Sequence, residues 1–225
     1  MGPVPSNPLD SPSEVQPTAG RGEGVGAVGF LHDRFVGNRR ITVLANWFAE
    51  IIPPHATVLD VGCGDGAISA VVQSKRADLH LRGIDVLPRK KTFIPVELFD
   101  GTHFPFPDAS FDAVLFSDVL HHTEDANVLL AEARRVAAQY VVIKDHYRKG
   151  WLAGARLRGM DWVGNARYGV ALPYNYWTEA QWDVAWQKLQ LVPERLVRNL
   201  RLYPVPGDWI FGAQLHFIAL LRRTR

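Results

Sequence analysis

The sequence predicts an α/β fold with a doubly wound, mostly parallel sheet. Short apolar runs that read as strands alternate with amphipathic helical segments between residues 38 and 146, and a glycine-rich turn follows the first strand run. The length of 225 residues and the hydrophobic content of 47% are enough for one domain with a sizeable core. We therefore expect a single domain over residues 26–225.

The first helix is expected over residues 38–52. Residues 1–25 are rich in Pro, Ser and Gly and lack apolar periodicity, so they are expected to form a disordered leader. Apolar residues then recur at helical spacing from Asn38 to Ile52, and Pro53 and Pro54 end the run.

The central part of the chain carries the strand and helix alternation. Alternating runs of this kind predict βαβ units, with helices on both faces of a parallel sheet. Strands are expected at 57–61, 79–87, 93–99, 111–120 and 140–146, and helices at about 67–74 and at 126–137.

The C-terminal part differs in composition from the rest. Residues 147–225 carry a net charge of +7 and six of the seven tryptophans. Its first segment, residues 147–192, is rich in Gly, Arg and aromatic residues, and we expect it to form an acceptor pocket and lid. That segment ends in a helix over 178–189, where Thr178 and Gln181 form a capping box. Two strands at 194–206 and 214–223, with a turn at 206–208, are expected to add an antiparallel hairpin.

Composition also limits the class of protein. A formal net charge of +2 argues against a dedicated nucleic-acid binder, and no apolar stretch approaches the roughly 20 residues of a membrane-spanning helix. The single cysteine, Cys63, excludes internal disulfides and a cysteine-built zinc site. We therefore expect a cytoplasmic protein with no membrane span, no nucleic-acid partner and no metal.

The stretch VLDVGCGDG, residues 58–66, indicates a ligand site at the first strand-to-helix turn. Its glycines also satisfy a permissive dinucleotide pattern, with Asp85 about 20 residues further on for a ribose. However, Asp60 and Asp65 would face the two negative charges of a pyrophosphate, whereas they suit a ligand with an ammonium and a sulfonium. The turn therefore favours a cationic ligand.

This stretch resembles the first motif of the class I S-adenosylmethionine-dependent methyltransferases. GIDV at 83–86 is similar to the acidic end of their second strand, and residues 98–125 resemble the segment that small-molecule (type 11-like) members place around adenine and the fourth strand. The resemblance covers residues 38–146, and the closing hairpin matches the family's last two strands. It implies a Rossmann-like methyltransferase fold with a seven-stranded sheet, and S-adenosyl-L-methionine as the cofactor.

The resemblance also implies which residues hold the cofactor. Asp60 and the glycine turn should hold the methionine end, Asp85 the ribose hydroxyls and Asp100 the adenine amino group. The cofactor-binding residues expected in this way are Asp60, Gly62, Cys63, Gly64, Asp65, Gly66, Asp85, Val86, Asp100, Gly101 and Ser117.

Methyl transfer gains chiefly from proximity and alignment, and a base helps when the acceptor is a hydroxyl. Candidates at the carboxyl edge of the sheet are His121 and His122 after the fourth strand, and Asp145, His146 and Tyr147 after the fifth. We expect His146 and His122 to be the catalytic residues. By strand alternation Lys144 and His146 should share one face, with Asp145 pointing away from His146.

The function expected from these residues is methyl transfer to a small organic or lipid-like acceptor. In the predicted pocket, Trp151, Trp162, Tyr168, Tyr174, Tyr176 and Trp177 supply apolar surface, and Arg156, Arg158 and Arg167 can meet negative charge. Aromatic and basic residues also interleave in RNA-binding proteins, so an RNA methyltransferase is the alternative enzyme. A catalytically silent protein that binds S-adenosylmethionine is the alternative outside enzymes.

Overall fold

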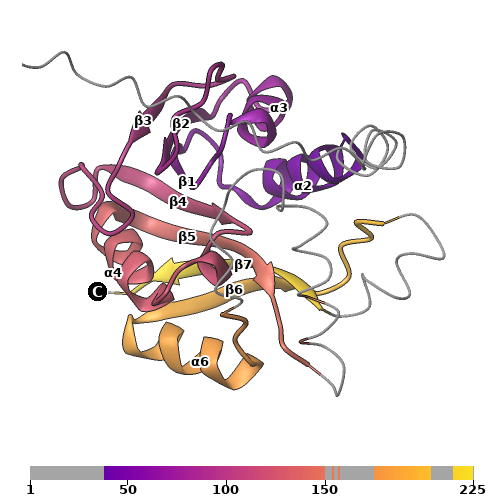
Figure 1. Ribbon diagram of the computed structural model, residues 1–225, viewed down its shortest axis with the longest axis vertical. Helices are drawn as coiled ribbons and strands as arrows, with labels where there is room; N and C mark the ends of the chain where they lie inside the picture. Colours follow the sequence, from indigo (N-terminus) through magenta and orange to yellow (C-terminus); the bar gives the residue numbers. More distant parts are fainter. Residues whose placement is uncertain (1–37, 150–153, 155–156, 158–174, 204–214, 225) are drawn as a thin grey trace, which may run out of the picture.

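A computed structural model describes residues 38–149, 154, 157, 175–203 and 215–224. In this part of the chain, seven strands form one sheet with helices on both faces (Figure 1). The strands are β1 (Thr57–Val61), β2 (His80–Asp85), β3 (Val96–Leu98), β4 (Phe111–Ser117), β5 (Ala137–His146), β6 (Leu191–Val197) and β7 (His216–Arg223). The helices are α2 (Asn38–Ile51), α3 (Ala67–Lys75), the 3₁₀ turn η2 (Leu120–His122), α4 (Ala126–Val136) and α6 (Glu179–Lys188).

The strand order reverses at the centre of the sheet, between β1 and β4, and in folds of this kind that point marks a crevice. The order is β3-β2-β1-β4-β5-β7-β6, and β1 to β5 pair in parallel, whereas β7 is antiparallel to both of its neighbours. The chain winds outward from β1 through β2 to β3, and then restarts on the other side at β4. Ligands of such sheets bind beyond the carboxyl ends of the two central strands. The predicted α/β fold with an antiparallel closing strand is confirmed.

Strand alternation sends the side chains of β4 to two separate cores. Ala113 and Leu115 join the core under α2, whereas Val114 and Phe116 join the core that also contains residues of α4 and α6. Because both faces are covered, the middle of β4 is buried and apolar on both sides. The residues that follow the strand are positioned by this packed segment.

Local signals account for the helix ends. α2 ends at Ile51, just before the proline pair, and buries Leu44 and Phe48. The capping box before α6 is present, since the Thr178 side chain accepts from the Gln181 N–H and the Gln181 side chain accepts from the Thr178 N–H. α6 packs Trp182 and Trp186 into the core, so this part of residues 147–192 is a structural layer of the domain.

Several strand boundaries differ from the predicted ones. β3 starts only at Val96, because Pro95 has no N–H to donate to a ladder. β5 begins at residue 137, directly after α4, and β6 covers 191–197 instead of 194–206, because its first residues pair with the end of β7 at Arg223. The leader 1–25 and the turn at 206–208 lie outside the described residues. Within the part that is described, no helix has both the length and the apolar character to cross a membrane.

Candidate active site

The glycine turn between β1 and α3 has three residues with positive φ. Gly62, Gly64 and Gly66 have φ values of 67°, 61° and 77°, a region that L side chains rarely adopt. A Cβ at Gly62 would lie 2.7 Å from Val119, and one at Gly66 would overlap Ile94, whereas a Cβ at Gly64 would meet nothing within 4 Å. Packing therefore excludes side chains at the outer two positions, and the backbone at Gly64 faces open space that a ligand can fill.

Asp60 is a buried carboxylate with one oxygen left over. Its Oδ2 accepts a hydrogen bond of 2.6 Å from Ser69 Oγ, whereas Oδ1 has no hydrogen-bond partner among the described residues. Burial raises the pKa of Asp60 to about 7, although the Ser69 hydrogen bond opposes this. A buried acceptor of this kind would be stabilised by a positively charged donor from a ligand.

Asp85, at the end of β2, is tied to the same turn. Its Oδ2 accepts from Gly64 N at 2.8 Å and its Oδ1 from Leu87 N at 2.8 Å. The side chain is buried, and each carboxylate oxygen keeps a second lone pair for a ligand hydroxyl. Asp85 is thus both a candidate ribose ligand and a support for the turn.

The residues predicted around adenine lie together after β2 and β3. Gly101 has φ +86°, and a Cβ there would lie 3.3 Å from Val86 Cγ1. Val86 itself is 51% exposed, which leaves an apolar surface for a flat ring. Asp100 Oδ1 accepts from Thr102 N, Thr102 Oγ1 and His103 N within its own turn, so contact with adenine would fall to Oδ2.

The remaining predicted cofactor residues are Ser117, Cys63 and Asp65. Ser117 ends β4, and its Oγ is buried and has no partner in the described part of the chain. The Cys63 side chain lies against Gly83, where a Cβ would overlap its sulfur, so its contact with a ligand would come from the backbone. Asp65 Oδ1 accepts from Ala67 N at the start of α3, and the residue is exposed. The Asp65 side chain thus binds the first N–H of α3.

Across the crevice, His121 and His146 converge on one carboxylate. His121 Nδ1 lies 2.7 Å from Asp145 Oδ1, and His146 Nδ1 lies 3.2 Å from the same oxygen. The expectation that Asp145 points away from His146 is wrong, because Asp145 Oδ1 turns to accept from the backbone N–H of His146 at 2.8 Å. Strand alternation fixes the direction of Cβ, and one side-chain rotation at the strand end overrides it.

The surroundings of Asp145 and His146 lower the pKa of both groups. Burial opposes ionisation of Asp145, but the charge and hydrogen bond of His121 hold its pKa below the ordinary value. Burial and then the charge of Lys144 lower the pKa of His146 from its ordinary 6.5. Asp145 is therefore ionised at neutral pH, and His146 is neutral and able to accept a proton at Nε2 while Nδ1–H faces the carboxylate.

Of the two neighbouring histidines, His121 is the one joined to Asp145. His122, predicted as catalytic, also lies in η2, and its ring centre is 4.1 Å from that of His121. Tyr176 stacks on His121 with ring centres 5.2 Å apart and meets His146 edge-on at 5.8 Å. The Tyr176 ring therefore covers the rings of both His121 and His146. Of the predicted pocket residues, Tyr176 and Trp177 are described, and Trp151, Trp162, Tyr168, Tyr174, Arg156, Arg158 and Arg167 lie outside the described residues.

Asp118, which follows Ser117, is a site residue that sequence reasoning missed. Asp118 forms ion pairs with Lys144 from β5 and Arg40 from α2, and its Oδ1 lies 3.6 Å from His146 Nδ1. Lys144 is buried and also lies 3.3 Å from His216 Nδ1. Strand alternation did place Lys144 on the face of His146, whereas the contact with Arg40 joins residues 78 positions apart.

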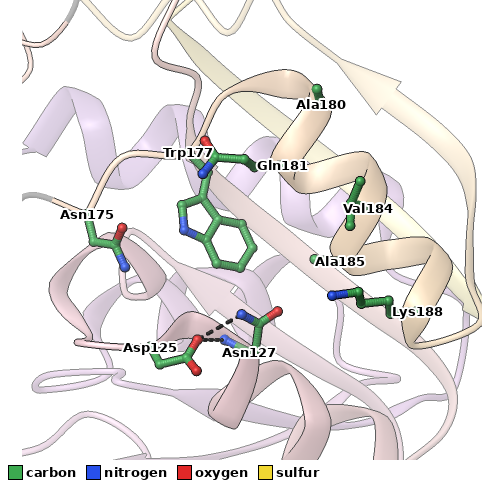
Figure 2. Close-up of a pocket in the computed structure, with 9 residues that line it drawn as sticks. All are labelled: Asp125, Asn127, Asn175, Trp177, Ala180, Gln181, Val184, Ala185 and Lys188. Carbon is green, nitrogen blue, oxygen red and sulfur yellow. Dashed lines mark hydrogen bonds between the residues drawn. The ribbon is translucent and has the colours of Figure 1, made fainter.

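A separate groove of about 420 Å³ lies between α4 and α6 (Figure 2). Asp125 and Asn127 line it from the start of α4, and the Trp177 ring points into it. It contains none of the predicted cofactor or catalytic residues. The groove is lined by Asp125, Asn127, Asn175, Trp177, Ala180, Gln181, Val184, Ala185 and Lys188.

Comparison with known proteins agrees with this geometry. Residues 59–140, which run from β1 into β5, match a family model described as a methyltransferase domain. This part of the chain is similar to methyltransferases, in keeping with its resemblance to the class I S-adenosylmethionine-dependent family. The family's cofactor fits the residues present, because Asp60 Oδ1 and Ser117 Oγ are buried acceptors without partners in the described part and Gly64 faces open space.

Two curated relatives carry names that refer to quinols or to quinone biosynthesis. A 2-methyl-6-phytyl-1,4-hydroquinone methyltransferase from Synechocystis sp. is 29% identical over 61% of this chain and 41% of that protein. A ubiquinone/menaquinone biosynthesis C-methyltransferase from Cupriavidus pinatubonensis is 29% identical over 59% of this chain and 62% of that protein. The chain thus spans less than two thirds of the length of either relative.

Solved structures confirm the fold. An S-adenosylmethionine-dependent methyltransferase from Thermotoga maritima has a TM-score of 0.64 at 16% identity, covering 87% of this chain and 95% of that one. Geranyl diphosphate C-methyltransferase from Streptomyces coelicolor, in complex with Mg²⁺, geranyl diphosphate and S-adenosyl-L-homocysteine, has a TM-score of 0.60 at 14% identity, covering 81% and 79%.

Proposed function

We propose that this protein transfers a methyl group from S-adenosylmethionine to a small organic acceptor that carries an acidic hydroxyl or carbon. The observation that carries the proposal is the pair of acidic residues around an open glycine turn, with a buried histidine and carboxylate across the crevice. The acidic residues at the glycine turn suit a cationic nucleoside, and the histidine with its carboxylate suits the removal of a proton from the acceptor.

On the cofactor side, the residues bind and orient. Asp60 Oδ1 would accept from the ammonium of the methionine end, and the second lone pairs of Asp85 would accept from the ribose hydroxyls. Val86 and Gly101 would line the adenine ring, and Ser117 would lie along the ligand at the end of β4. The bound cofactor supplies an electrophilic methyl group on sulfur, which is transferred in line to the acceptor.

On the acceptor side, His146 would remove the proton as the acceptor attacks. Asp145 holds its Nδ1–H, so that Nε2 is the basic nitrogen, and stabilises the imidazolium that forms. His121 is bound to the same oxygen and would support Asp145 in its ionised form. His122 remains a candidate for orienting the acceptor from η2.

The acceptor is proposed to be flat and largely apolar, such as a hydroquinone or phenol. The rings of Tyr176, His121 and His146 are in contact and form one aromatic surface, against which an aromatic ring packs well. The hydroquinone in the name of one relative, and the quinone biosynthesis in the name of another, support this class of acceptor. We also propose that residues 147–192 contribute the remaining walls of the acceptor pocket, within one domain over residues 26–225.

Two measurements on the full chain test the function. Calorimetry should show binding of S-adenosylmethionine and none of NADH. Methyl-labelled cofactor should then pass label to a small-molecule extract and to 2-methyl-1,4-hydroquinone, and leave RNA and protein pools unlabelled. Label in RNA would favour the RNA methyltransferase, and cofactor binding without label in any pool would mean a protein that binds without transferring. Cell fractionation tests the expected cytoplasmic location.

A further inference from the structure

Asp118 has an unusual backbone for its position. It directly follows β4 with φ +59°, in the left-handed region that Asp and Asn enter more readily than most residues. Its N–H donates to Lys144 O at 2.9 Å, so the backbone is fixed to β5 as well. Non-glycine residues held in this region concentrate at functional sites, because the surrounding structure must stabilise them.

Two cations from different elements hold the Asp118 side chain. Lys144 reaches it from β5 and is itself 1% exposed, and Arg40 reaches it from the first turn of α2 with its side chain 37% exposed. Burial disfavours the charged form of Asp118, but Lys144 and then Arg40 hold its pKa well below the ordinary value. The carboxylate is therefore a fixed junction between β4, β5 and α2.

Asp118 lies between the proposed cofactor side and the proposed acceptor side of the site. Ser117 precedes it along the cofactor side, and His146 Nδ1 lies 3.6 Å from Asp118 Oδ1. We propose that Asp118 is a positioning residue for methyl transfer, held by Lys144 and Arg40 so that it fixes Ser117 relative to His146. This inference rests on the proposed function, because it assigns no chemical step to Asp118 itself.

The same region has the spacing of a metal site. Asp118, His121, Asp145 and His146 offer ligand atoms that all lie within 4.8 Å of one another. However, Lys144 and Arg40 already supply two positive charges to Asp118, and both would repel a divalent ion in this buried setting. The geometry therefore favours charge pairing at Asp118.

A double variant distinguishes the positioning role of Asp118 from its role in neutralising Lys144. Asp118→Asn keeps the tolerance for positive φ but leaves the Lys144 ammonium buried without its carboxylate, which destabilises a fold. Combining it with Lys144→Met restores the net charge of the wild type. We expect the double variant to melt within a few degrees of the wild type and to bind S-adenosylmethionine with a Kd within about threefold. Its kcat for the hydroquinone probe or the labelled extract fraction should fall by about 10- to 100-fold, the effect of a misplaced reacting group.

Two neighbouring arginines, Arg40 and Arg39, provide a matched comparison. Arg40→Gln removes one support of Asp118 and should lower kcat several-fold with the cofactor Kd unchanged. Arg39→Gln, its exposed neighbour that donates to Arg201 O, should change neither quantity. Equal effects of the two substitutions would contradict the proposal.

Three further results would overturn it. The first is wild-type kcat in the double variant. The second is a crystal structure of that variant in which Ser117 and His146 keep their wild-type positions, a measurement that needs no acceptor and therefore stands even if the proposed function fails. The third is loss of activity in EDTA that added Zn²⁺, Mn²⁺ or Mg²⁺ restores, which would make the cluster a metal site.

Discussion

The carboxylate of Asp85 accepts a hydrogen bond from the backbone N–H of Gly64, with 2.8 Å between Oδ2 and N. This contact joins the end of β2 to the central residue of the glycine turn, at the position where the backbone faces open space. The residue proposed to bind the ribose therefore also holds the turn that is proposed to bind the methionine end. Losing its side chain should affect both the ribose and the methionine parts of the cofactor.

Asp85→Ala should weaken S-adenosylmethionine binding by at least about 1.5–3 kcal/mol, the range for a hydrogen bond to a charged group. The loss of the Gly64 and Leu87 contacts should also lower Tm, which a purely ligand-binding role would not do. Asp85→Asn, which keeps one acceptor oxygen, should lose less of both. Calorimetry and thermal melting measure the two effects, and unchanged affinity in Asp85→Ala would remove this residue from the site.

Asp60 should make the ligand-free protein less stable as pH rises. Its pKa is raised by burial from 3.8 to about 7, so between these values the folded state binds more protons than the unfolded state. Stability from this group is therefore present at low pH and is lost as pH rises towards 7. Urea unfolding at several pH values should show the trend in the wild type relative to Asp60→Asn.

Cofactor affinity should follow the opposite trend. An ammonium near Asp60 Oδ1 favours the ionised carboxylate, so affinity should rise with pH up to about 7 and level off above it. In Asp60→Asn this rise should disappear. An identical pH dependence in the wild type and the variant would show that Asp60 does not meet the ammonium.

Gly64 and Gly66 should respond differently to alanine. Both need positive φ, which costs an L residue about 1–2 kcal/mol. At Gly66 the methyl group also overlaps Ile94, so Gly66→Ala should lower Tm more than Gly64→Ala does. At Gly64 the methyl group enters the open space, so Gly64→Ala should weaken cofactor binding with a smaller change in Tm. Equal changes in Tm and affinity for the two variants would contradict a ligand at Gly64.

The sequence predicted the parts of the fold that depend on local signals. The proline pair after α2, the capping box at Thr178 and the glycine turn after β1 each specify their structure within a few residues. The Asp118 junction could not be predicted in this way, because Arg40 and Lys144 reach it from distant parts of the chain. Asp145 was misplaced for another reason, since periodicity orients Cβ and leaves the rotation of the carboxylate undetermined.

Tyr176 should affect the acceptor more than the cofactor. It contacts both histidine rings of the Asp145 pair, and it is 6% exposed. Tyr176→Ala should raise KM for the acceptor or lower kcat by about 10-fold or more, in keeping with the loss of well-oriented contacts. Tyr176→Phe keeps the ring and should retain most of the activity. Equal loss of cofactor affinity and turnover in Tyr176→Ala would mean that the residue only supports the fold. Trp162→Ala is likewise predicted to impair acceptor turnover more than cofactor affinity.

His146 should carry the pH dependence of turnover. The charged and titratable groups that face it are Asp118, His121, Lys144, Asp145, Tyr176 and His216. Burial and Lys144 lower the pKa of His146 below its ordinary 6.5, so the neutral, proton-accepting form should predominate at pH 7. We expect kcat to fall only as pH drops through an inflection below 6.5, where the ring becomes protonated.

His146→Ala should then lower kcat by about 10²-fold or more, remove that inflection and leave cofactor affinity nearly unchanged. His122→Ala should lower kcat less and keep the inflection, because Asp145 binds His121 and His146. His80→Ala, at an exposed position at the start of β2, is the control and should match the wild type. If His146→Ala keeps the turnover and the pH profile of the wild type, then His146 has a structural role, and methyl transfer in this protein depends on the alignment of its two substrates alone.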